Sequence, residues 1–134
     1  MSPDTGNSRP RRILLIEDDA RLRTTLAELL RHAGFEVIEA EEGGQGIALF
    51  AEKAADLVIT DLIMPGKEGM ETILELRQAH PQIKILAMSG GGRLRAAEYL
   101  PIAAAAGADQ TIEKPFSIDK LLLLVNDLLE SDPD

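Results

Sequence analysis

The sequence predicts an α/β fold in which five parallel strands form a doubly wound sheet, with helices on both faces. Two observations lead to this prediction. Short segments rich in aliphatic residues alternate five times with segments of helical apolar spacing. Polar side chains follow four of these strands, and the carboxyl ends of parallel strands share one edge of a sheet. We therefore expect one crevice to hold Glu17, Asp18, Asp61, Ser89 and Lys114.

The predicted strands differ in how far they are covered by helices. Residues 13–16 are a continuous apolar run, which is typical of a central strand buried on both faces. Residues 35–40 alternate apolar side chains with glutamates, which suits a less buried edge strand. The remaining strands are expected at residues 57–60, 83–88 and 110–113.

Helices are expected between these strands. Asp19 is a candidate N-cap of the first helix, and Gly34 is its candidate C-terminal glycine. Further helices are predicted at 43–53, 68–78, about 98–106 and after Ser117, with a flexible loop at the three glycines 90–92. The apolar positions expected on the first, third and last helices are Leu22, Leu26, Leu29 and Leu30; Met70, Ile73, Leu74 and Leu76; and Ile118, Leu121, Leu122, Val125, Leu128 and Leu129.

The chain length of 134 residues predicts a single domain. Residues 1–10 are polar and contain two prolines, so we expect a disordered N-terminal tail, a domain over 11–131 and a frayed C-terminus at 132–134. Apolar residues make up 45% of the chain but aromatic residues only 3%, so the core must consist of Leu, Ile, Val and Ala.

Composition excludes several functional classes. The net charge of −9 repels phosphate backbones, so direct binding to nucleic acid is not expected. The absence of cysteine excludes disulfides, thiolate metal sites and a cysteine nucleophile. No apolar run approaches the roughly 18 residues of a membrane span, and the N-terminus has no signal-peptide core. We expect a soluble cytoplasmic protein with no membrane partner.

The acidic residues of the predicted crevice suit a divalent cation. Two carboxylates about 4 Å apart repel each other by on the order of 4 kcal/mol at an effective dielectric near 20. Glu17, Asp18 and Asp61 together with Lys114 carry a formal charge of −2, which one Mg²⁺ neutralises with its preferred oxygen ligands. For Asp19, the N-cap role is the favoured interpretation.

Asp61 has two further interpretations. It is either a turn residue before Met64-Pro65-Gly66 or a nucleophile that attacks phosphorus in line and forms an aspartyl phosphate. In the second case the metal and Lys114 would neutralise charge on the phosphoryl oxygens. Ser89 would donate to one of these oxygens, helped by the backbone N–H of Gly90. Taken singly, Lys114 and Ser89 also fit an exposed lysine and an ordinary loop serine.

Combined, these motifs resemble the receiver domain of two-component response regulators over about residues 11–131. The matching segments are Ile13–Asp19 with Leu22-Arg23, Asp61–Gly66 with Gly69, Ser89-Gly90, Gly107–Asp109 and Lys114–Phe116. The resemblance implies a flavodoxin-like (βα)5 fold with strand order 2-1-3-4-5. It also implies that Asp61 is the phosphoacceptor, that Glu17, Asp18, Asp61 and the carbonyl of Ile63 hold Mg²⁺, and that Ser89 and Lys114 contact the phosphoryl group.

The resemblance also implies partners. The phosphoryl donor would be a phosphohistidine on a sensor histidine kinase or phosphotransfer protein, and phosphorylation would change docking to a downstream protein. Hydrolysis would reset the switch, and the chain would not otherwise be an enzyme. Because no output domain follows residue 131, we expect a stand-alone regulator or a phosphorelay intermediate.

The chain departs from the family pattern in two ways. Thr111 occupies the position, three residues before Lys114, where the family usually has a switch aromatic. The segment from Ser89 to Lys114 is also longer than usual, with the excess in Gly90–Arg95. Our hypothesis is that this glycine-rich loop, and not a ring rotation, carries the phosphorylation signal into the fourth helix.

Two other functions remain open. A receiver-like interaction module that is not phosphorylated is compatible with Thr111. A Mg²⁺-dependent phosphohydrolase that passes through an aspartyl phosphate is disfavoured. It would ordinarily need a second acid two residues after the nucleophile, where this chain has Ile63.

Overall fold

A computed structural model of the chain describes residues 10–62, 69–89 and 107–130. These residues form a five-stranded parallel sheet in the order β2-β1-β3-β4-β5, which confirms the predicted α/β fold and strand order. The strands are β1 (Arg12–Ile16), β2 (Glu36–Ala40), β3 (Leu57–Asp61), β4 (Lys84–Ser89) and β5 (Gln110–Glu113). The predicted tail before Pro10, the glycine-rich loop, the helix near 98–106 and the residues after 130 lie outside the described residues.

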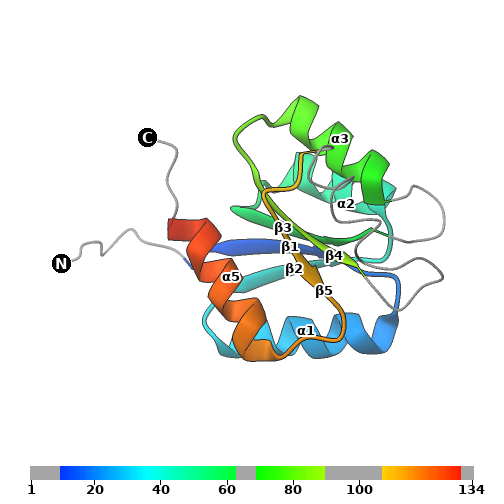
Figure 1. The fold of residues 1–134 in the computed structure, drawn as a ribbon. Helices are drawn as coiled ribbons and strands as arrows, with labels where there is room; N and C mark the ends of the chain where they lie inside the picture. The colour runs from blue at the N-terminus through cyan, green and yellow to red at the C-terminus, as the bar shows by residue number, and fades with distance from the viewer. Residues whose placement is uncertain (1–9, 63–68, 90–106, 131–134) are drawn as a thin grey trace.

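Helices cover both faces of the sheet (Figure 1). The described helices are α1 (Ala20–His32), α2 (Gly43–Glu52), α3 (Gly69–Ala79) and α5 (Ile118–Glu130). One apolar cluster joins α1 and α5 to the sheet, and the other joins α2 and α3 to its opposite face. Within the described residues, no helix combines the length and the apolarity needed to cross a bilayer.

The continuous apolar run of β1 follows from its place between β2 and β3. Side chains alternate along a strand, so Ile13 and Leu15 enter the cluster beneath α1 and α5, while Leu14 and Ile16 enter the other cluster. All four are essentially inaccessible to solvent. Strand β2 lies at the edge of the sheet and leaves its two glutamates partly exposed, as its alternating sequence predicts.

The first helix begins and ends at the predicted residues. The Asp19 carboxylate accepts hydrogen bonds from the backbone N–H groups of Arg21 and Leu22 and so caps α1. At the other end Gly34 has a φ of 105°, which an L side chain rarely adopts. Its N–H donates to Arg31 O and that of Phe35 donates to Leu30 O, which is a Schellman arrangement.

Two residues that the apolar spacing predicts on the buried faces of helices are exposed, so the prediction is wrong for them. Leu29 on α1 is 38% exposed and Leu74 on α3 is 46% exposed. Each lies next to a buried residue, Leu30 or Ile73, and neighbours on a helix point about 100° apart. On α3 the buried set instead includes Thr72. Apolar spacing therefore located the buried stripe but not its border.

Candidate functional site

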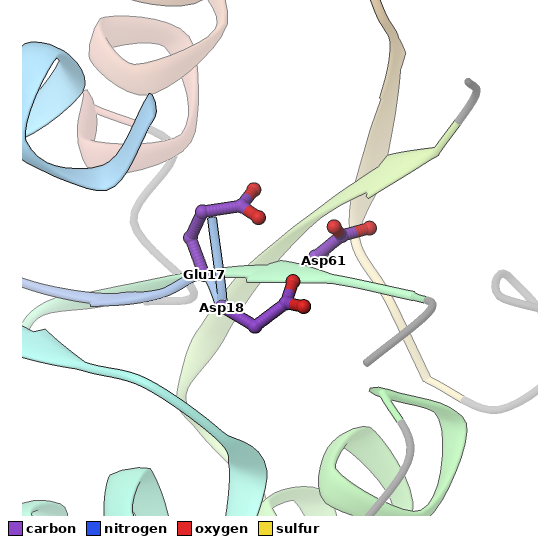
Figure 2. Close-up of side chains that lie close together, drawn as sticks. All are labelled: Glu17, Asp18 and Asp61. Carbon is purple, nitrogen blue, oxygen red and sulfur yellow. The ribbon is translucent and has the colours of Figure 1, made fainter. Parts of the chain in front are cut away.

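Three carboxylates meet where β1 and β3 end. Glu17 and Asp18 follow the last residue of β1, and Asp61 is the last residue of β3. One oxygen from each carboxylate lies within 4.8 Å of the others. Figure 2 shows the three side chains directed toward a common space. Glu17 and Asp61 are buried whereas Asp18 is exposed, so the cluster opens to solvent on the Asp18 side.

Lys114 completes this cluster from the end of β5. Its Nζ donates to Glu17 Oε1 and to Asp61 Oδ2, each at 2.9 Å. Its backbone N–H donates to Ser89 O at 2.6 Å, which joins the ends of β4 and β5. The following peptide, Lys114–Pro115, is cis. The predicted convergence of residues from β1, β3 and β5 is therefore present.

The charges in the cluster are only partly balanced. Burial raises the pKa of Glu17, and the like charge of Asp61 acts in the same direction, although the hydrogen bond from Lys114 opposes it. Burial by itself would lower the pKa of Lys114, but its hydrogen bonds to Asp61 and Glu17 outweigh this effect and the pKa is raised. Lys114 is thus a positively charged side chain beside three carboxyl groups, those of Glu17, Asp18 and Asp61.

Ser89 brings a buried hydroxyl to the same edge. It ends β4, one residue beyond Met88, which pairs with Asp61 in the sheet. Its Oγ is buried and has no hydrogen-bond partner among the described residues. A buried polar group without a partner costs about 1–3 kcal/mol, so this hydroxyl is suited to a ligand oxygen.

Gly69 fixes the start of α3 against Asp61. A Cβ at Gly69 would lie 2.2 Å from the carbonyl oxygen of Asp61 and 2.5 Å from Leu62 Cα, so no larger residue fits without backbone movement. The Gly69 N–H donates to Leu62 O at 3.2 Å. In the sequence Gly69 is only part of a motif, and nothing there predicts that it packs directly on the backbone of the site.

The donor set of this site fits a hard divalent cation. Its side chains supply carboxylate oxygens, which Mg²⁺ prefers, and the three acids with Lys114 retain a net negative charge. Two predicted contributors, the Ile63 carbonyl and the Gly90 N–H, lie outside the described residues. Thr111 pairs with Ala87 in the sheet and is partly buried.

The fold and the site together define a doubly wound α/β domain with an acidic cluster at the carboxyl ends of its strands. The family model of the response regulator receiver domain matches residues 13–126. The chain belongs to this family.

Relatives and solved structures agree with this assignment. The chemotaxis protein CheY of Bacillus subtilis is 35% identical over 119 residues, which cover 88% of this chain and 97% of CheY. The transcriptional regulatory protein CpxR of Klebsiella pneumoniae is 36% identical, and the match covers 88% of this chain but only 49% of CpxR. The chain thus spans about half the length of that relative. The receiver domain of NtrX from Brucella abortus superposes with a TM-score of 0.83 at 30% identity, over 90% of this chain and 99% of that domain.

Proposed function

We propose that this chain is a phosphoacceptor whose Asp61 receives a phosphoryl group from a phosphohistidine. The observation that carries this proposal is the position of the Asp61 carboxylate between an acidic pair and a lysine. A carboxylate in such a place can act as a nucleophile, because the groups around it offset charge on the incoming phosphoryl oxygens.

The transfer needs one bond to form and one to break. An oxygen of Asp61 attacks phosphorus, and the P–N bond to the donor histidine breaks with its electron pair remaining on the imidazole. Lys114 is within 2.9 Å of Asp61 Oδ2 and is placed to pair with a phosphoryl oxygen. The hydroxyl of Ser89 would donate to another oxygen. The N–H of Gly90 is predicted to do the same.

The carboxylates of Glu17, Asp18 and Asp61 would hold Mg²⁺, with the Ile63 carbonyl as a predicted further ligand. When bound, Mg²⁺ supplies positive charge that offsets the charge of the phosphoryl group.

The donor would be a sensor histidine kinase or a phosphotransfer protein. A segment of the sensor kinase CckA of Brucella abortus is 33% identical to 88% of this chain, so similar domains occur within sensor kinases. The phosphorylated chain would bind a downstream protein. It would not act as an enzyme on a separate substrate, since both transfer and hydrolysis take place on its own Asp61.

Intact mass measurement after incubation with acetyl phosphate and Mg²⁺ tests this function. We expect a single phosphate adduct on the wild type and none on Asp61→Asn, because the amide is not a nucleophile. Asp119→Asn, which changes an exposed acid on α5, is the matched control and should be modified like the wild type. An adduct on Asp61→Asn would contradict the assignment of Asp61.

The alternative function is a receiver-like interaction module that is not phosphorylated. The complete set of charged site residues argues against it, whereas Thr111 in place of an aromatic is compatible with it. A folded wild type that acquires no adduct in the presence of Mg²⁺ would support this alternative.

A further inference from the structure

Arg23 on α1 reaches back to the turn that carries the acidic pair. Its Nη1 donates to the backbone carbonyl of Glu17 at 2.8 Å. Its Nε lies 3.5 Å from Glu39 Oε1 on the edge strand β2. The Arg23 side chain is only 13% exposed, so both contacts are made in a largely desolvated position.

Every polar group of Glu17 has a partner. The backbone N–H donates to Ala40 O at 3.0 Å. The carboxylate accepts from Lys114 Nζ through Oε1 and from the Asp19 N–H, at 3.1 Å, through Oε2. The remaining group, the carbonyl, accepts from Arg23. Arg23 therefore holds the peptide unit that joins Glu17 to Asp18.

Asp18 depends on this peptide unit for its position. Its side chain is exposed, and no described residue makes a hydrogen bond or ion pair with its carboxylate. The direction in which this carboxylate points is consequently set by the backbone on either side of it. On one side the backbone is held by Arg23, and on the other by the capping interactions of Asp19.

We propose that Arg23 is a positioning residue for the cation site, and that Glu39 holds Arg23 in place. Groups outside the ligands that orient a metal site typically change metal affinity by about 10–100-fold when they are mutated. This inference rests on the proposed Mg²⁺ site. It adds a residue that touches neither the cation nor the phosphoryl group.

Arg31 provides an internal control. It also pairs with Glu39, at 3.1 Å from Nη2 to Oε2, but its hydrogen bond goes to Val37 O and not to Glu17. A substitution at Arg31, like one at Arg23, disturbs Glu39 and helix α1. It leaves the hydrogen bond to the Glu17 carbonyl, and so the Glu17–Asp18 peptide unit, intact.

A purely electrostatic role for Arg23 predicts the opposite results. A positive charge near the acidic pair repels Mg²⁺, so Arg23→Gln would then bind Mg²⁺ more tightly and Arg23→Lys would bind it like the wild type. Positioning predicts weaker binding in both variants. Lysine keeps the charge, but its single nitrogen cannot reproduce a planar fork that contacts two acceptors with different nitrogens.

Isothermal titration calorimetry with MgCl₂ on the full chain separates these roles, and the chain has no tryptophan for a fluorescence readout. We expect the dissociation constant to rise about tenfold in Arg23→Lys and Arg23→Gln, and to stay within twofold of wild type in Arg31→Lys. Glu39→Gln, which weakens the pairs of Glu39 with both Arg23 and Arg31 but leaves both arginines in place, should raise it less, by about threefold. Urea unfolding in EDTA checks that each variant is folded.

Wild-type affinity in Arg23→Lys, or tighter binding in Arg23→Gln, would overturn the positioning role while leaving the Mg²⁺ site intact. If Arg23→Gln does not fold, Arg23→Lys and Glu39→Gln decide the question in the same way. A wild type that binds no Mg²⁺ would overturn the metal site of the proposed function, and with it the role of Arg23.

Discussion

The two ends of β1 use charged residues in opposite ways. At the amino end, Arg12 donates from its backbone N–H to Asp56 at 2.7 Å, from Nε to Glu36 at 3.0 Å and from Nη1 to Ala54 O at 2.7 Å. Lys53 also pairs with Glu36. At the carboxyl end, three carboxylates share Lys114.

The pKa values reflect this difference. The hydrogen bonds from Arg12 and Lys53 hold the pKa of Glu36 below its ordinary value. Burial holds the pKa of Glu17 above it, despite the contact with Lys114. Charge at the amino end therefore stabilises the folded chain, whereas charge at the carboxyl end is retained at the expense of stability. Such a cost is expected where a site is built to receive a cation.

Removal of Lys114 should have the largest effect on stability. Lys114→Met removes a cation that contacts both buried acids, Glu17 and Asp61, and breaking a buried pair costs about 3 kcal/mol or more. We expect this loss in urea unfolding with EDTA, together with a larger stabilisation by Mg²⁺ than in the wild type. Lys53→Met is the control, since its pair with Glu36 is more exposed, and it should lower the free energy of unfolding far less than Lys114→Met does. Equal losses in the two variants would contradict the contrast between the ends.

Removal of Arg12 should affect the fold but not the site. Arg12→Met loses the hydrogen bonds to Glu36 and Ala54 O. The free energy of unfolding should fall, but by less than in Lys114→Met, because Glu36 is solvated and its charge is screened. The increment added by Mg²⁺ should equal that of the wild type, and a changed increment would show that the two ends are coupled.

Asp18→Asn should stabilise the protein in EDTA. It removes one of three mutually repelling charges, and Asp18 is exposed, so we expect a gain of about 1 kcal/mol or less. In Mg²⁺ the same variant should lose most of the metal-linked stabilisation. A loss of stability in EDTA would indicate that Asp18 supports the fold.

The smallest expected effect is on the pH dependence of stability. The raised pKa of Glu17 contributes stability that is complete below pH 4.5 and is lost as pH rises through the folded value. The lowered pKa of Glu36 contributes stability that is present above pH 4.5 and is lost as pH falls through the folded value. In EDTA, the free energy of unfolding of the wild type minus that of Glu17→Gln should fall as pH rises. The same quantity for Glu36→Gln should rise, and trends of the same sign would contradict the assignment.

Much of the fold and the site was predictable because both depend on the strands. Apolar runs located the strands, and acids directly after two of them had to meet at one edge of a parallel sheet. Lys114 was placed there by the same reasoning. The exposure of Leu29 and Leu74 was not predictable, since periodicity gives the centre of a buried stripe better than its border.

Two other features depend on geometry that no local pattern records. Glu17 is buried and Asp18 exposed, although adjacent acids after a strand give no indication of which one turns inward. Arg23 is the fourth residue of α1, where its sequence context fits a solvent-facing arginine equally well. Only its contacts with Glu17 O and Glu39 reveal that it turns back toward the site.

The most direct test of the cation site is anomalous diffraction from crystals soaked in Mn²⁺, which shares the oxygen-ligand preference of Mg²⁺. We predict one strong peak among the carboxylates of Glu17, Asp18 and Asp61 in the wild type, and a weaker peak or none in Asp61→Asn. A peak elsewhere on the surface, with none among these three side chains, would contradict the account.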